Sequence, residues 1–110
     1  MNIAKKKEPN ALVVTVTGRM DAATSPEFEK DILESIAQGE KSFLINLSGL
    51  EYISSAGLRS ILAAAKRLKE QNGEIIFSGL QGHVKEVFAI SGFQGIFKIF
   101  DSDAEGLKSL

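Results

Sequence analysis

The chain has 110 residues, of which 44% are apolar and 25% charged, and its formal net charge is −1. This composition is typical of one globular domain, which we take as residues 1–110. The lysines are spread along the chain and form no basic block, which argues against nucleic-acid binding. Cysteine is absent, which excludes disulfides and thiolate sites. There is no secretory signal, and no apolar run approaches the roughly 20 residues that span a bilayer. We therefore expect a cytoplasmic protein without membrane insertion.

Five segments have the pattern of β-strands. They are residues 2–7, 12–17, 42–47, 74–78 and 97–100. The first is polar, as in an edge strand, and the second is rich in β-branched residues and is expected to end at Gly18. The third is apolar on both faces, which is typical of a strand in the centre of a sheet.

Four helices are predicted between and after these strands. The first begins near Thr24 and stops at Gly39, and the second runs from 56 to about 70. The third ends before Gly92, and its apolar face carries Val84, Val87, Phe88 and Ile90. The fourth follows a possible cap at residues 101–103. Two caps are possible at the N-terminus of the first helix: Thr24 with Glu27 fits a capping box, and Ser25 with Pro26 fits a cap followed by proline at the first helical position. The expected buried stripe of the second helix is Leu58, Ile61, Leu62, Ala65 and Leu68.

The alternation of strands and helices predicts an α/β fold. We expect a mixed, mostly parallel β-sheet of four to five strands with about four α-helices packed on it. The helical crossover between residues 42–47 and 74–78 should make these two strands parallel, with a right-handed connection.

Two adjacent serines, Ser54 and Ser55, stand where a loop enters the second helix. The first N–H groups of a helix lack internal partners and favour negative charge, so a serine there either caps the helix or accepts a phosphate without unfolding it. Gly57 falls in the first helical turn, which indicates either close approach of another backbone or a tight turn. Asp21 follows the strand at 12–17 and is either a turn residue or a neighbour of the serines.

Features of the common enzyme sites are missing from the sequence. His83 is the only histidine, and we expect it to be a surface or capping residue. There is no nucleophile elbow, no phosphate-binding loop and no cluster of metal ligands. We therefore predict no catalytic residue, no metal and no cofactor.

Four segments together resemble a STAS domain, and more narrowly a bacterial anti-sigma factor antagonist. They are Gly18–Asp21, Ile45–Leu58, Gly73–Ile75 and Ile90–Phe93, in the order and spacing of the family. The resemblance implies a non-enzymatic partner-switching protein that binds an anti-sigma factor with serine kinase activity and thereby releases a sigma factor.

In this family the kinase phosphorylates the serine two residues before the glycine of the loop, and a metal-dependent serine/threonine phosphatase reverses the reaction. The resemblance assigns this role to Ser55, followed by Gly57. The family usually has Asp before that serine, and Ser54 stands there instead as a competing site. Asp21 lies beside the phosphorylated serine in the family pattern.

The resemblance and the local chemistry together define a candidate partner-binding face. Its residues are Asp21, Glu51, Ser54, Ser55, Gly57 and Arg59. Arg59 either reaches a partner carboxylate or lies in solvent. The chain is expected to be a monomer, and the apolar residues Ile96, Phe97, Ile99 and Phe100 are the place for a dimer contact if one exists.

Two other functions remain open at the level of sequence. A soluble STAS subunit docking on the ATPase of a membrane transport or lipid-trafficking complex would use the same face without phosphorylation. A small catalytic domain would use Ser54 or Ser55 as a nucleophile, although no second histidine or clustered acid pair supports it.

Overall fold

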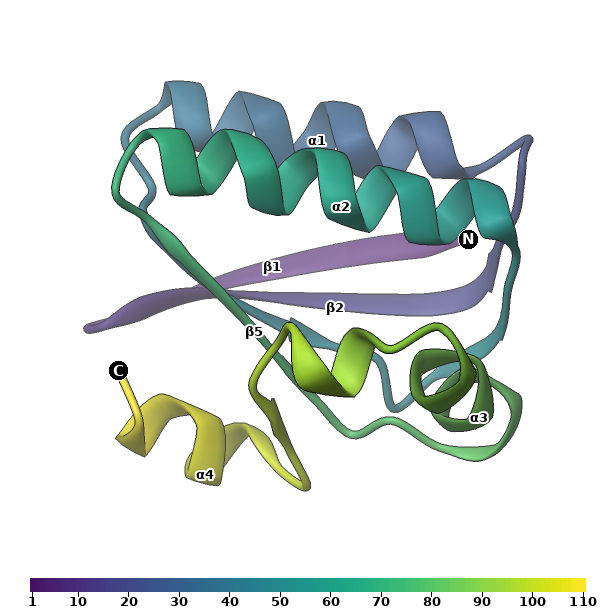
Figure 1. Ribbon diagram of the computed structural model, residues 1–110. Helices are drawn as coiled ribbons and strands as arrows, with labels where there is room; N and C mark the ends of the chain where they lie inside the picture. Colours follow the sequence, from purple (N-terminus) through teal and green to yellow (C-terminus); the bar gives the residue numbers. More distant parts are fainter.

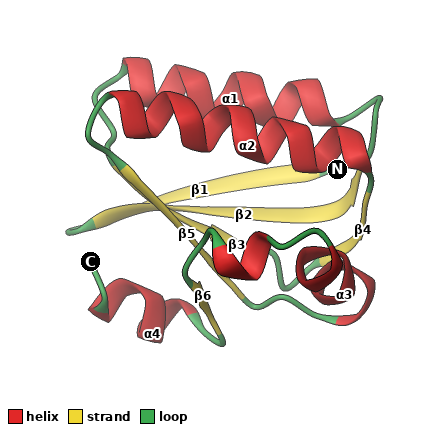
Figure 2. Ribbon diagram, viewed as in Figure 1, coloured by secondary structure: helices red, strands yellow, loops and turns green.

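Strands and helices alternate along the chain and form a six-stranded sheet with helices on both faces (Figures 1 and 2). The computed structural model describes residues 1–110. The strands are β1 (Asn2–Glu8), β2 (Ala11–Met20), β3 (Ser42–Asn46), β4 (Leu50–Ile53), β5 (Glu74–Ser78) and β6 (Ile99–Phe100). The helices are α1 (Ser25–Ala37), α2 (Ser55–Glu70), α3 (Gly82–Ile90) and α4 (Asp103–Lys108), with a short 3-10 helix η1 (Phe93–Gly95).

The sheet is mixed and mostly parallel, which confirms the predicted fold class. Its main order is β1-β2-β3-β5-β6, and β4 pairs with β2 outside this path. Only β1 and β2 are antiparallel. The strands β3 and β5 are parallel, with Ile45 opposite Phe77, as the helical crossover through α2 predicts.

The central strand β3 is buried on both faces, because each face carries its own apolar layer. Phe43 and Ile45 belong to the larger core, which α1, α2 and α3 cover, whereas Leu44 points to the opposite face. There Val13, Leu44 and Ile76 form a smaller cluster against α4 (Figure 1). An apolar strand without alternation is the expected sequence signature of this arrangement.

The predicted strands differ from the observed ones in three places. The strand β2 does not end at Gly18 but continues to Met20, and β4 lies in a segment that we expected to be a loop. The register of the β2–β4 pairing shifts at Gly18, whose φ is +92°. This bulge, which glycine accommodates, lets β2 leave β3 and pair with β4 beyond it. The last strand is also shorter than predicted, covering only Ile99–Phe100.

Two of the predicted buried side chains are exposed. On α2, Ile61 and Leu68 are buried as expected, but Leu62 is 41% exposed. On α3, Ile90 is 86% exposed, because the helix ends there and its buried positions are Val84 and Phe88. The helix boundaries themselves agree with the prediction, and none of the helices is long and apolar enough to cross a membrane.

Neither predicted cap of α1 forms as expected. Thr24 is the N-cap residue, but its side chain makes no capping hydrogen bond. Its hydroxyl instead accepts a hydrogen bond from the Asp21 N–H and donates one to the Arg19 carbonyl oxygen, both at 2.9 Å. The Thr24 hydroxyl thus links the start of α1 to the end of β2 instead of capping the helix. At α4, by contrast, Ser102 caps as predicted, accepting from the Glu105 N–H at 3.2 Å.

Candidate functional site

The candidate face lies where β2 and β4 end side by side. These strands are parallel, with Met20 opposite Ile53, so their carboxyl ends reach the same edge of the sheet. The Ser54 N–H donates to the Met20 carbonyl oxygen at 2.9 Å and continues the pairing past the end of β4. In α/β sheets, ligand and partner sites concentrate at this edge. Asp21 and Ser54 therefore directly follow a pair of hydrogen-bonded strand ends, although the second strand is β4 and not the predicted strand at 42–47.

Gly57 lets α2 start directly against the end of β2. A Cβ atom at this position would stand 3.0 Å from the Met20 carbonyl oxygen and 2.7 Å from Ile53 Cγ1. Such distances leave no room for a side chain, so close approach of another backbone, one of the two explanations that the sequence left open, is present. The glycine thereby sets how near the first turn of α2 lies to the loop that carries Asp21.

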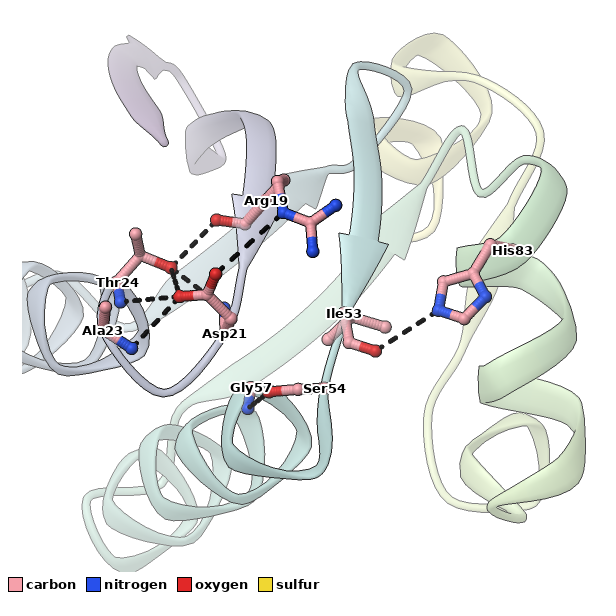
Figure 3. Close-up of polar contacts among 8 residues, drawn as sticks. All are labelled: Arg19, Asp21, Ala23, Thr24, Ile53, Ser54, Gly57 and His83. Carbon is pink, nitrogen blue, oxygen red and sulfur yellow. Dashed lines mark hydrogen bonds and ion pairs between the residues drawn. The ribbon is translucent and has the colours of Figure 1, made fainter.

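The carboxylate of Asp21 is held by the loop that it starts (Figure 3). Its Oδ1 accepts hydrogen bonds from the N–H groups of Thr24 and Ala23, each at 3.1 Å, and shares the Thr24 hydroxyl proton, at 3.2 Å, with the Arg19 carbonyl oxygen. The Arg19 Nε lies 4.0 Å from its other oxygen. The backbone hydrogen bond from Thr24, aided by the other donors and by Arg19, holds the pKa of Asp21 below its ordinary value of 3.8. Asp21 is therefore ionised at neutral pH, with the Arg19 guanidinium beside it.

The two serines differ in their surroundings, and Figure 3 shows the contact of Ser54 with Gly57. Ser54 is the N-cap of α2, is half-buried, and accepts a long hydrogen bond of 3.4 Å from the Gly57 N–H. Ser55 is the first residue of the helix and is exposed. The capping role therefore belongs to Ser54, which leaves the Ser55 hydroxyl at the surface next to the positive end of the helix dipole.

Aromatic stacking adds three residues to this edge that the sequence did not identify as a group. The Arg19 guanidinium lies 4.2 Å from the centre of the Tyr52 ring, and the His83 ring stacks on Tyr52 with centroids 5.0 Å apart and an interplanar angle of 3°. Nε2 of His83 also lies 3.4 Å from the Ile53 carbonyl oxygen, one residue before the serine pair (Figure 3). Only the shifted register places Arg19 opposite Tyr52, so no local sequence signal marks this stack.

Glu51 and Arg59 flank the serine pair on different elements. Glu51 is exposed on β4 and lines a shallow hollow of about 340 Å³ together with the start of α3, including His83. Arg59 is exposed on α2, four residues after Ser55, so both side chains lie on one face of the helix. The six predicted residues thus occupy one edge, with Glu51 towards α3 and Arg59 one turn along α2.

The sequence is similar to proteins named as anti-sigma factor antagonists. BtrV of Bordetella bronchiseptica, which bears such a name, is 36% identical over 102 residues, covering 93% of this chain and 88% of BtrV. An anti-sigma-B factor antagonist of Listeria monocytogenes is 30% identical over 109 residues, covering 96% of this chain and 95% of the relative.

Solved structures show the same fold at lower identity. One is a Thermotoga maritima protein named as an anti-sigma factor antagonist, with a TM-score of 0.92, 18% identity, and coverage of 97% of this chain and 92% of that one. Another is the Bacillus cell fate determinant SpoIIAA in its phosphorylated form, with a TM-score of 0.77, 19% identity and 98% coverage of both chains. The STAS domain family model matches residues 2–106. The chain therefore belongs to the STAS domain family.

Proposed function

We propose that this protein is an anti-sigma factor antagonist that binds an anti-sigma factor with serine kinase activity and is released from it by phosphorylation of Ser55. The observation that carries the proposal is the exposed Ser55 at the first position of α2, beside a cap that Ser54 already provides. The names of the two sequence relatives support the same role. The protein acts in this proposal as a binding partner and kinase substrate in the cytoplasm, not as an enzyme.

The partner-binding face of the proposal is the edge that carries Asp21, Glu51 and the serine pair, together with Gly57 and Arg59. A phosphate adds about −1.5 to −2 charges at neutral pH, next to the fixed charge of Asp21. Repulsion of roughly 3–4 kcal/mol against the partner would weaken binding a few hundredfold. Within the chain, the same phosphate meets the N-terminus of α2, which favours it by about 0.3–1 kcal/mol, so the fold should persist.

The environment of the two hydroxyls favours Ser55 over Ser54 as the modified residue. Modification of Ser54 would remove the cap that accepts from the Gly57 N–H and would place a phosphate at a half-buried position. Ser55 requires neither change. The existence of a phosphorylated form of SpoIIAA supports the compatibility of a phosphate with this fold. A metal-dependent serine/threonine phosphatase would restore the binding form.

The test incubates the protein with ATP and each anti-sigma kinase encoded in the same genome, followed by intact-mass and site-mapping mass spectrometry. One phosphate on Ser55, lost in Ser55→Ala and retained in Ser54→Ala, is the expected result. Phosphate on Ser54 would overturn the site but keep the switch. No phosphate with any kinase would contradict the proposal and favour a subunit that docks on the ATPase of a transport or lipid-trafficking complex.

A second measurement separates binding from modification. Ser55→Asp should bind the anti-sigma partner at least about tenfold more weakly than the unmodified chain, because one added charge reproduces part of the phosphate effect. Ser55→Asn is the matched neutral control and should bind as the unmodified chain does. Equal binding by Ser55→Asp and Ser55→Asn would contradict a charge-based release. Sedimentation of the free protein tests the monomer that the proposal assumes.

A further inference from the structure

A groove away from the edge that carries Asp21, Glu51, Ser54 and Ser55, here called the serine edge, collects exposed apolar side chains. It has a volume of about 510 Å³ and lies between the C-terminal half of α2, the start of β5 and the chain that follows η1. Leu62, which is 41% exposed, lines one wall, and Ile96, which is 62% exposed, lines the other. Two of the three exposed large apolar side chains of the protein thus line the same groove.

The wall on α2 is a continuous helical stripe next to the buried one. It consists of Leu62, Ala65, Lys66 and Lys69, at the i, i+3, i+4 and i+7 spacing of one helix face. The neighbouring stripe, with Ile61, Ala64 and Leu68, is the one that packs on the sheet. The helix therefore presents a second, partly apolar face to the groove instead of to the core.

The charge of the groove is positive. Lys66, Lys69 and Lys98 line it, and Glu74 is the only acidic residue among the lining side chains. Glu74 pairs with Lys98 at 3.4 Å, whereas Lys66 and Lys69 form no ion pair with any carboxylate of the chain. Two free ammonium groups thus border an apolar depression.

We propose that this groove docks an acidic amphipathic helix of a partner protein, with apolar side chains between Leu62 and Ile96 and carboxylates against Lys66 and Lys69. Charge complementarity selects this occupant over a second copy of the chain, since a two-fold interface here would oppose lysines with lysines. The concave shape selects a helix over a lipid surface, because a helix ridge fills a groove that a planar membrane cannot enter.

The groove is separate from the serine edge, so the inference does not depend on the proposed function. Ser55 begins α2, whereas the groove starts at Leu62, about 10 Å further along the axis at the usual rise per residue, and includes Lys66 at about 16 Å. An acidic helix in the groove would leave Asp21 and Ser55 free for another protein. Leu62, at the near end of the groove, lies one turn after Arg59, so a second partner could bind at the same time only if it leaves Arg59 uncovered.

The test is an NMR titration of the ¹⁵N-labelled protein with a synthetic helical peptide that has leucines along one face and glutamates on both flanks. Chemical-shift changes should concentrate on Leu62–Lys69 and Ile96–Lys98. Lys66→Glu with Lys69→Glu should weaken binding by about tenfold or more. Lys85→Glu with Lys108→Glu is the matched control, because it makes the same charge change at exposed residues outside the groove and should leave binding within about twofold.

Additional variants and controls test whether the peptide binds in this groove and whether another occupant fits it better. Leu62→Asp and Ile96→Asp change exposed side chains and should fold while binding the peptide more weakly. Ser55→Asp should bind it like the unmodified chain, which separates this result from the fate of the proposed function. The inference is overturned if a scrambled peptide of the same composition binds equally well, or if no chemical shift changes at the groove residues. It is also overturned if the Lys66/Lys69 and Lys85/Lys108 double variants weaken binding equally. Dimerisation that Leu62→Asp abolishes, or binding only to phosphatidylglycerol vesicles, would also overturn it.

Discussion

At the scale of single residues, Gly57 gives the sharpest expectation about the serine edge. Alanine normally stabilises a helical glycine position by about 0.5–1 kcal/mol. Here the added Cβ would meet Met20 and Ile53 at 3.0 Å or less, and part of that contact is backbone. We expect Gly57→Ala to lower the free energy of unfolding by about 1–3 kcal/mol, measured by urea denaturation.

The control for Gly57 is Gly95, where a Cβ would meet nothing within 4 Å. Gly95→Ala should change the free energy of unfolding by less than about 0.5 kcal/mol, or raise it slightly. A stabilising Gly57→Ala would show that α2 does not lie against the end of β2 as described.

Asp21 predicts a specific dependence of stability on pH. Because hydrogen bonds from the Thr24 loop lower its pKa in the folded state, the ionised carboxylate stabilises the fold above its ordinary pKa of 3.8. That contribution is lost as pH falls through the lowered folded pKa. Asp21→Asn, which keeps an oxygen acceptor but no charge, should be less stable than the unmodified chain at pH 7 and approach it below pH 3.8.

The measurement for Asp21 is the urea midpoint of both proteins over a pH series from neutral to acid. Asp21→Ala, which removes the acceptor as well, should remain the least stable of the three at every pH. A gap between Asp21→Asn and the unmodified chain that does not change with pH would mean that the charge of Asp21 has no role in stability.

Residue-level prediction from the sequence succeeded where the cause was local. Glycine inside a first helical turn is costly unless something approaches closely, so the contact at Gly57 was readable from its position. The stack of Arg19, Tyr52 and His83 was not readable, because it joins three elements and depends on the register shift at Gly18. The roles of Asp21, Glu51, Ser55 and Arg59 in binding stay predictions.

At the scale of elements, two part-buried hydrogen bonds of one carboxylate tie the short helix α4 to the sheet. The Asp103 carboxylate accepts from the Ser78 hydroxyl at 2.6 Å and from the Asn46 side chain at 3.0 Å, which ties α4 to the ends of β3 and β5. Ser78 is fully buried, so Asp103→Ala would leave its hydroxyl without this partner. We expect a loss of about 1–3 kcal/mol in the free energy of unfolding, measured by urea denaturation.

Asp101 provides the comparison for Asp103, because it is exposed and lies just before the same helix. Asp101→Ala should change the free energy of unfolding by no more than about 0.5 kcal/mol. Equal losses in the two variants would mean that charge near α4, rather than the contact with Ser78 and Asn46, supports the helix.

Element prediction was accurate for the helices and for β1, β3 and β5, ended β2 too early and missed β4 altogether. The strand β4 has four residues, of which only Leu50 and Ile53 are buried, so its pattern is too short to distinguish from a loop. The exposure of Leu62 was missed for another reason. Helical periodicity identifies an apolar face but does not tell whether the sheet or an open groove meets it.

At the scale of the whole molecule, the two-sided core predicts an order of local stability. The strand β3 pairs on both sides and buries Phe43, Leu44 and Ile45 completely, whereas β1 and β6 are the edges of the main sheet. Amide hydrogen exchange should therefore be slowest in β3 and faster in β1 and β6, since only global unfolding exposes the centre. Equal protection of β1 and β3 would contradict this order.

The position of the first residue has a practical consequence for labelling the protein. The Cα of Met1 lies 3.3 Å from where a Cβ of Gly18 would stand, so the start of the chain adjoins the bulge that leads β2 to Asp21. Figure 1 shows the other end of the chain, after α4, on the far side of the molecule. A fluorophore or affinity tag joined before Met1 would crowd the serine edge, whereas the same group after Leu110 would leave it accessible to a kinase or binding partner.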